Sequence, residues 1–115
     1  ANSLKFCERA RSAMLRLLGI DQRAASEAGE GHYAVAEANI RYLRPAGLDD
    51  SLQVQTTCVE LGAASVRLAQ QVWRDGEMLV DFSVRVGFIG PLGRPRRQPA
   101  AWRAAFETFF GKVTG

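Results

Sequence analysis

The sequence has few of the residues that build metal sites, disulfide scaffolds or membrane spans. One histidine and two cysteines occur in 115 residues, too few for a disulfide scaffold, and neither cysteine has a partner at metal-ligand spacing. No apolar run approaches the roughly 20 residues that cross a bilayer, and the first residues do not resemble a signal peptide. We therefore expect a cytoplasmic protein with reduced thiols, no membrane span and no metal site.

Neither sign of charge dominates. Fifteen Lys and Arg against 12 Asp and Glu give a net charge of +3, a mild excess that suits phosphate-bearing partners without demanding nucleic acid. Nucleic-acid binding would rest only on this charge and on Arg94, Arg96 and Arg97, which are better interpreted as solvated surface arginines, so we expect no nucleic-acid partner. With 115 residues and a 47% hydrophobic content, we expect one globular domain over residues 1–115.

Hydrophobic spacing predicts a helix at the start of the chain. Apolar residues recur at three- and four-residue steps from Ser3 to Leu18, and Gly19 stands where a left-handed cap would end the helix. Asn2 or Ser3 can cap its first amides. The stretch from Asp21 to His32 has no clean period and is interpreted as a loop with room for one helical turn.

The period then changes to two, which predicts strands. The first would place one set of side chains on a single face, its small members leaving room for the helix: Ala34, Ala36, Ala38, Ile40 and Tyr42. Pro45 ends this strand and Gly47–Ser51 turns the chain. Further strands are predicted at Leu52–Leu61, Ser65–Trp73 and Met78–Phe88, the last two joined by the Asp75-Gly76 hairpin.

A helix followed by four strands predicts an α+β fold with an antiparallel sheet packed on the helix. The unpaired sheet edges fit pairing with a second subunit or a further strand. A final amphipathic helix would carry Trp102, Phe106 and Phe109 as a stripe that covers the sheet or contacts a subunit.

No complete catalytic constellation appears. His32 is interpreted as a solvated loop residue and Cys7 as a core residue. Glu8 would pair with Arg11 or Ser12 on the helix surface. Spacing alone names no activity.

The ordered segments of the chain nevertheless resemble a known family. They are NSLKFCERARSAMLRLLGID, IRYLRPAGLDDSLQV, ELGAAS, RDGEML and GRPRRQP. Together they are similar to acyl-CoA thioesterases of the 4-hydroxybenzoyl-CoA thioesterase type, including the branch associated with the Tol-Pal system.

This resemblance implies a hot-dog fold, homodimers or homotetramers, and hydrolysis of an acyl-CoA to a carboxylic acid and coenzyme A, with no metal or redox cofactor. It places the thioester carbonyl against the amides at Asn2 and Ser3, where the helix dipole stabilises an oxyanion. The family's first strand and catalytic aspartate would precede Ala1, so they are expected upstream of this chain. Ser3 stands where the family often has a tyrosine.

The resemblance implies that Arg44, Ser65 and Arg67 bind coenzyme A. An ordinary exposed strand position explains each of these residues equally well. The alternative function is a non-catalytic hot-dog domain that binds acyl-CoA or an acyl carrier protein. The acyl group and the number of subunits stay open.

Overall fold

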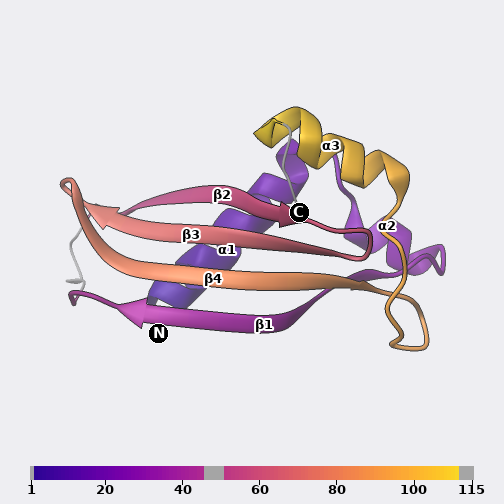
Figure 1. Cartoon of the computed structure of the whole chain (residues 1–115), viewed down its shortest axis with the longest axis horizontal. Helices are drawn as coiled ribbons and strands as arrows, with labels where there is room; N and C mark the ends of the chain where they lie inside the picture. The colour runs from indigo at the N-terminus through magenta and orange to yellow at the C-terminus, as the bar shows by residue number, and fades with distance from the viewer. Residues whose placement is uncertain (1, 46–50, 112–115) are drawn as a thin grey trace.

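The computed structural model describes residues 2–45 and 51–111, without the side chains of residues 2–4. One long helix crosses a single face of an antiparallel sheet with strand order β1-β4-β3-β2 (Figure 1). The elements are α1 (Asn2–Leu17), α2 (Gln22–Glu27), β1 (His32–Tyr42), β2 (Gln53–Leu61), β3 (Ser65–Arg74), β4 (Glu77–Ile89) and α3 (Ala100–Phe110). The predicted α+β arrangement is confirmed. The predicted turn at Gly47–Ser51 falls largely on residues 46–50, outside the described part.

Helix α1 follows the sequence prediction. Its apolar stripe buries Cys7 and Met14 against β2 and β3. Gly19 ends the helical segment with φ of 76°, a left-handed conformation that favours glycine. The core prediction for Cys7 is confirmed, since only 1% of this residue is exposed.

The segment between α1 and β1 is more ordered than expected. Its six-residue helix α2 is capped by Asp21, whose Oδ1 accepts a hydrogen bond from the Ala24 amide at 3.0 Å. Gly31 follows in a buried position, with φ of 135°. A Cβ there would lie 2.2 Å from the Ile89 carbonyl oxygen, so only glycine lets the chain enter β1 at this point.

The predicted face of β1 is correct from Ala38 onward and wrong before it, because the strand contains a bulge. Val35 lies opposite Val86 and Glu37 opposite Arg85, so Ala36 is an extra residue without a partner. Tyr33 and Val35 therefore share the helix-facing side of the sheet with Ala38, Ile40 and Tyr42, the residues beyond the bulge. Ala34 lies across from Gly87 on the other side. The expected row of three alanines under the helix does not exist.

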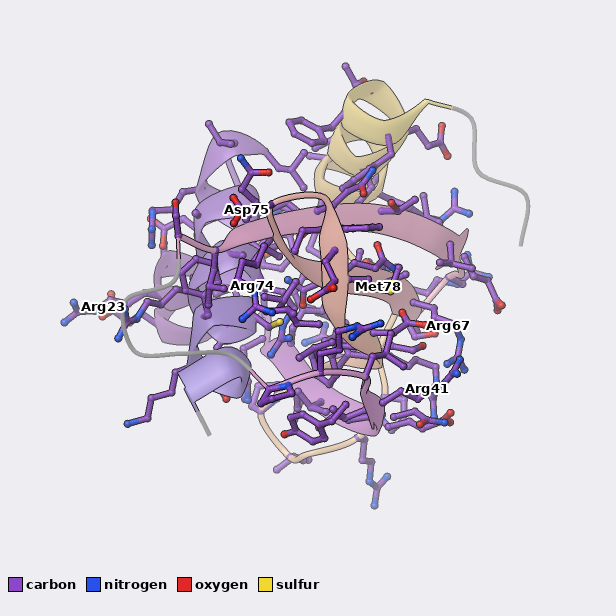
Figure 2. All side chains as sticks on the ribbon, turned by 90° about the vertical axis from the view of Figure 1, so that its left-hand side faces the viewer. Arg23, Arg41, Arg67, Arg74, Asp75 and Met78 are labelled. Carbon is purple, nitrogen blue, oxygen red and sulfur yellow. The ribbon has the colours of Figure 1, made fainter. Side chains whose placement is uncertain are left out.

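The two faces of the sheet differ in chemistry. The inner face, toward α1, carries the buried side chains Val66, Leu68, Gln70, Val72, Val80, Phe82, Val84 and Phe88. On the outer face, Arg41 and Arg67 project on the side opposite α1 (Figure 2). Among the described residues, the helices pack against the inner face, and one packed face is typical of an antiparallel sheet.

Helix α3 covers one end of the sheet with part of the expected aromatic stripe. The Trp102 ring lies 5.5 Å from Tyr33 and 5.4 Å from Phe88, centroid to centroid, and Phe106 is fully buried. Phe109 is 52% exposed, so it does not cover the sheet, and Phe110 packs against the core instead. A subunit contact by Phe109 stays a prediction. Within the described residues, no helix is long and apolar enough to cross a bilayer.

Candidate functional site

Helix α1 offers the backbone chemistry expected at the start of the chain. It begins at Asn2 and runs for 16 residues, so the amides of its first turn have no partner within the helix. Its dipole and these free N–H groups favour negative charge at that end. The side chains of Asn2 and Ser3 lie outside the described part of the structure. The backbone alone can therefore stabilise an oxyanion here, and the roles of both residues stay a prediction.

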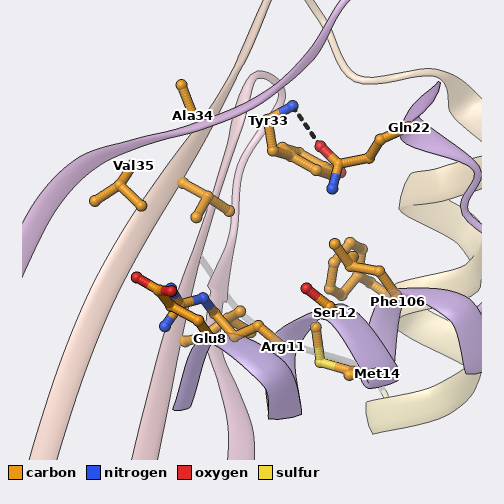
Figure 3. Close-up of a pocket in the computed structure, with 12 residues that line it drawn as sticks. Glu8, Arg11, Ser12, Met14, Gln22, Tyr33, Ala34, Val35 and Phe106 are labelled. Atoms are coloured by element: carbon orange, nitrogen blue, oxygen red, sulfur yellow. Dashed lines mark hydrogen bonds between the residues drawn. The ribbon is translucent and has the colours of Figure 1, made fainter. Parts of the chain in front are cut away.

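A cavity of about 340 Å³ lies between α1, the α2 segment and β1, and we call it the α1–β1 cavity. Its lining is Glu8, Arg11, Ser12, Met14, Leu15, Gln22, Tyr33, Ala34, Val35, Leu68, Val86 and Phe106. In Figure 3, Glu8 and Arg11 line the end of the cavity toward Val35, and Phe106 lies at the other end. The cavity thus combines one charged end with apolar walls.

Arg11 is partly buried at this charged end. Its Nη1 donates a hydrogen bond to Gln70 Oε1 at 2.8 Å, and its guanidinium carbon lies 5.3 Å from the centre of the Phe82 ring. Burial lowers the pKa of Arg11, while the nearby charges of Cys7 and Glu8 act in the opposite direction. The expected ion pair between Glu8 and Arg11 is absent from the described contacts, although the two side chains line the same cavity.

Gln70 supports this arrangement from the sheet. It is fully buried, and its Nε2 donates to the Cys7 carbonyl oxygen at 3.1 Å and to Thr56 Oγ1 at 3.3 Å. One amide therefore joins α1, β2, β3 and the Arg11 side chain. Sequence reasoning missed it, although the signal was available. Gln70 interrupts an alternating apolar pattern and shares its face of the strand with Val66, Leu68 and Val72.

Ser65 and Arg67 come together on the outer face, two residues apart on β3. Ser65 lies opposite Gly87 and Arg67 opposite Arg85. Both arginines approach Glu37, with nitrogen-to-oxygen distances of 3.5 and 3.8 Å. Beside them is a second cavity of about 310 Å³, the outer cavity. Its lining is Ala34, Val35, Ala36, Ala64, Ser65, Arg85, Gly87, Phe88, Ile89 and Pro95.

The backbone beside Ser65 is fixed by Gln98, another residue that the sequence analysis missed. Gln98 Nε2 donates to the carbonyl oxygens of Gly62 and Ser65 at 2.9 and 3.3 Å, and its Oε1 accepts from the Tyr33 hydroxyl. The loop before α3 therefore holds the connection between β2 and β3, and with it one wall of the outer cavity.

Arg44 lies elsewhere. Its backbone amide bonds to the Leu79 carbonyl, and its side chain pairs with Glu77 at 3.4 Å, near the hairpin between β3 and β4. Ser65 lies opposite Gly87 of β4. Gly87 is eight residues beyond Leu79, the partner of the Arg44 amide, which corresponds to about 25 Å at the usual strand rise. Within one chain, Arg44 and Ser65 therefore do not share a site.

The remaining candidates take structural or solvated positions. His32 is exposed and is the first residue of β1 rather than part of a loop. Arg96 Nη1 donates to the carbonyl oxygens of Gly29 and Glu30 at 3.3 and 2.9 Å, whereas Arg94 and Arg97 are exposed. Across residues 2–45 and 51–111, no three His, Cys, Asp or Glu side chains form a group that could hold a metal ion.

Comparison with known proteins agrees with this layout. Residues 1–80 match the model of the Thioesterase superfamily. The chain is 33% identical over 107 residues to a Haemophilus influenzae protein named acyl-CoA thioesterase YbgC, a match that covers 89% of this chain and 79% of that protein.

Solved structures show the same architecture. A probable thioesterase from Bartonella henselae is 32% identical, with a TM-score of 0.77, and the match covers 86% of this chain and 82% of that chain. A thioesterase from Thermus thermophilus, complexed with coenzyme A and Zn, is 26% identical, with a TM-score of 0.75 and coverages of 97% and 81%. The helix packed on a four-stranded antiparallel sheet is the expected hot-dog fold.

Proposed function

The chain belongs to the thioesterase superfamily, and from this membership we infer that it hydrolyses acyl-CoA thioesters to a carboxylic acid and coenzyme A. The observation that carries this inference is the 33% identity to a named acyl-CoA thioesterase over 89% of the chain. Coenzyme A bound to a 26% identical structure of the same fold supports the same substrate class.

The start of α1 suits the chemical step. A water oxygen attacks the thioester carbonyl carbon, and the carbonyl π electrons move to its oxygen. The unpaired amides at Asn2 and Ser3 stabilise this oxyanion, together with the helix dipole. When the carbonyl re-forms, the carbon–sulfur bond breaks and its electrons leave with the thiolate of coenzyme A. Following the family resemblance, we assign proton removal from the water to a carboxylate ahead of Asn2.

The outer face suits the phosphate-bearing end of coenzyme A. Ser65 supplies a hydroxyl group. Arg67 and Arg85 both pair with Glu37, and their guanidinium groups can bind a phosphate at the same time. The small residues Ala34 and Gly87 leave the outer cavity open beside them. Arg44 would contact coenzyme A from a different part of the assembly.

One coenzyme A molecule would need two subunits. Ser65 and Arg67 lie on the outer face, whereas α1 packs on the inner face. The sheet separates the two regions within one chain, so a ligand that touches both would take them from different subunits. We therefore propose a homo-oligomer, dimeric or tetrameric, and its formation is supported by the exposed apolar side chains Val35, Tyr42 and Leu43 at or next to the edge strand β1.

Thiol release from a panel of acyl-CoAs tests the activity, with this chain and a form carrying its natural upstream residues assayed side by side. Hydrolysis only by the longer form would support the upstream carboxylate. Binding of coenzyme A without hydrolysis by either form would favour the non-catalytic alternative, and the absence of both would contradict the proposed function.

The coenzyme A assignment has its own test. We expect Arg67→Gln to raise KM for an acyl-CoA about three- to tenfold with little change in kcat, because a charged hydrogen bond to a phosphate is lost. The same variant should not change KM for an acyl-pantetheine, which lacks the nucleotide. Equal effects on both substrates would contradict the assignment, and Arg97→Gln, at an exposed loop position, is the matched control.

A further inference from the structure

Arg11 differs from the other partly buried arginines. Arg67, Arg74, Arg85 and Arg103 each have a carboxylate oxygen within 4.0 Å, supplied by Glu37, Glu77 or Glu107. Arg11 has no such partner in the part of the chain that the structure describes. The charge of Glu8 acts on Arg11 from the same cavity, but it is not in contact with the guanidinium. A cation that is partly removed from water without a carboxylate in contact is costly, so its position indicates a place for an anion.

The free donors of Arg11 belong to the α1–β1 cavity. Only its Nη1 has a described hydrogen bond, to Gln70, and a guanidinium has five N–H groups. The cavity walls around it include the apolar side chains of Val35, Val86 and Leu68. Burial lowers the pKa of Arg11 because the charged form loses hydration. A carboxylate in the cavity would replace the hydration that the Arg11 guanidinium loses.

Arg11 also lies at the end of the cavity nearer the start of α1, where the thioester carbonyl is proposed to bind. Ser3 and Arg11 are eight residues apart on α1, a rise of about 12 Å. Helical side chains tilt toward the N-terminus, so the guanidinium lies closer to the first turn than its own Cα does. Glu8 and Arg11 occupy one end and Phe106 the other (Figure 3). A short acyl group held at the start of α1 would reach Arg11 before the apolar end.

We propose that Arg11 binds a carboxylate at the far end of a short acyl group, so that the preferred substrates are coenzyme A thioesters of short dicarboxylic acids. This inference rests on the proposed function and narrows its substrate class. Arg11 is then the residue that determines specificity, and Gln70 holds its guanidinium in place.

Glu8 is the feature that opposes a carboxylate here. Its side chain lines the same cavity, but the residue is exposed, so water screens its charge more than that of Arg11. Removing the Glu8 charge should therefore strengthen the carboxylate preference. Glu8 has no described hydrogen bond to Gln70 or Arg11, which makes Glu8→Gln a conservative probe of the electrostatics.

The test measures binding of two matched, non-hydrolysable ligands by isothermal titration calorimetry. They are the carboxypropyl and the butyl thioethers of coenzyme A, which differ by a carboxylate in place of a methyl group. We expect this chain to bind the carboxypropyl ligand about tenfold more tightly, the size of one charge-assisted hydrogen bond. Arg11→Gln should abolish the preference, Arg11→Lys should keep part of it, and Glu8→Gln should increase it.

The ratio of the two affinities within each variant cancels losses that come from folding or from coenzyme A binding. If Arg11→Gln does not fold, Glu8→Gln and Arg11→Lys still decide the outcome. Equal binding of both ligands by the unmodified chain, or a preference unchanged in Arg11→Gln, would overturn the inference and leave the proposed function intact. Binding of neither ligand would instead contradict the coenzyme A site itself and the inference with it.

Discussion

At the scale of single residues, two buried amides connect the elements that matter for function. Gln70 ties the Cys7 carbonyl of α1 to Thr56 and to Arg11, and Gln98 ties the Ser65 carbonyl to the Tyr33 hydroxyl. A buried amide is favourable only when its donors and acceptors are satisfied. Both meet this condition with backbone carbonyls, which fixes the main chain as well as the side chains.

Replacing Gln70 tests how much this connection contributes. We expect Gln70→Leu to lower the free energy of unfolding by about 1–3 kcal/mol, because Arg11 and Thr56 lose a partner in a partly buried place. Urea denaturation measures the change. Gln55→Leu is the matched control, since Gln55 is exposed on β2 and should change stability by no more than about 0.5 kcal/mol. Equal effects at both positions would contradict the role of Gln70.

Tyr33 predicts a dependence of stability on alkaline pH. Burial raises the pKa of Tyr33 well above its ordinary value of 10.0. Above pH 10 the unfolded chain therefore loses this proton while the folded chain keeps it, and stability falls by up to about 1.4 kcal/mol per pH unit. Urea denaturation at successive pH values should show a shallower fall for Tyr33→Phe. An unchanged slope would contradict the prediction.

Some of the slope should remain in that variant. Burial also raises the pKa values of Cys7 and Cys58 above 9.0. A raised thiol pKa changes the stability with pH in the same direction as the raised pKa of Tyr33. Stability is present below the unfolded pKa and is lost as pH rises above it. The difference between the two slopes, rather than either slope alone, reports Tyr33.

At the scale of elements, the bulge in β1 decides which side chains face the helix. Ala36 is the extra residue between the pairs formed by Val35 and Glu37. If Ala36 were absent, the pairs Val35 with Val86 and Glu37 with Arg85 would be consecutive pairs of a regular antiparallel ladder. By taking up Ala36 as an extra residue, the bulge leaves Val35 on the face of the α1–β1 cavity and Glu37 beside Arg67 and Arg85, the faces that both would have in a regular strand without Ala36.

Two single-residue deletions test this account. Deletion of Ala36 should be tolerated, with a loss of about 1 kcal/mol or less, because every neighbour keeps its face. Deletion of Ala38 should cost several kcal/mol, because either Ile40 and Tyr42 leave the inner face or Glu37 moves onto it. Thermal unfolding of the two variants gives the comparison, and similar losses for both would show that Ala36 is not the extra residue.

At the scale of the whole molecule, the two faces of the sheet have different roles. The inner face packs against α1 and holds the α1–β1 cavity, while the outer face carries ion pairs such as Arg67 with Glu37 and Arg41 with Asp81. A net charge of +3 is too small to steer a ligand by itself. Recognition of an anionic ligand would therefore depend on where the arginines lie.

Assembly is the property to test at this scale. We expect sedimentation to give a mass of two or four times 12.6 kDa. The double variant Tyr42→Lys, Leu43→Lys should shift this mass toward that of the monomer, because charges on the edge of β1 oppose strand pairing. The control is Leu92→Lys, in a loop where Leu92 is 85% exposed, and it should not change the mass. A monomer for the unmodified chain would contradict the proposed assembly.

The sequence by itself determined the order of the long first helix, the four strands and the final helix, the α+β class and the burial of Cys7, since these follow from periodicity and turn residues within short windows. Family resemblance added the fold name and the activity. The tertiary structure decided what depends on pairs distant in sequence: the bulge at Ala36, the separation of Arg44 from Ser65, and the contact of Arg11 with Gln70. Periodicity cannot register an unpaired strand residue, and spacing along the chain does not report which charges the sheet brings together or keeps apart.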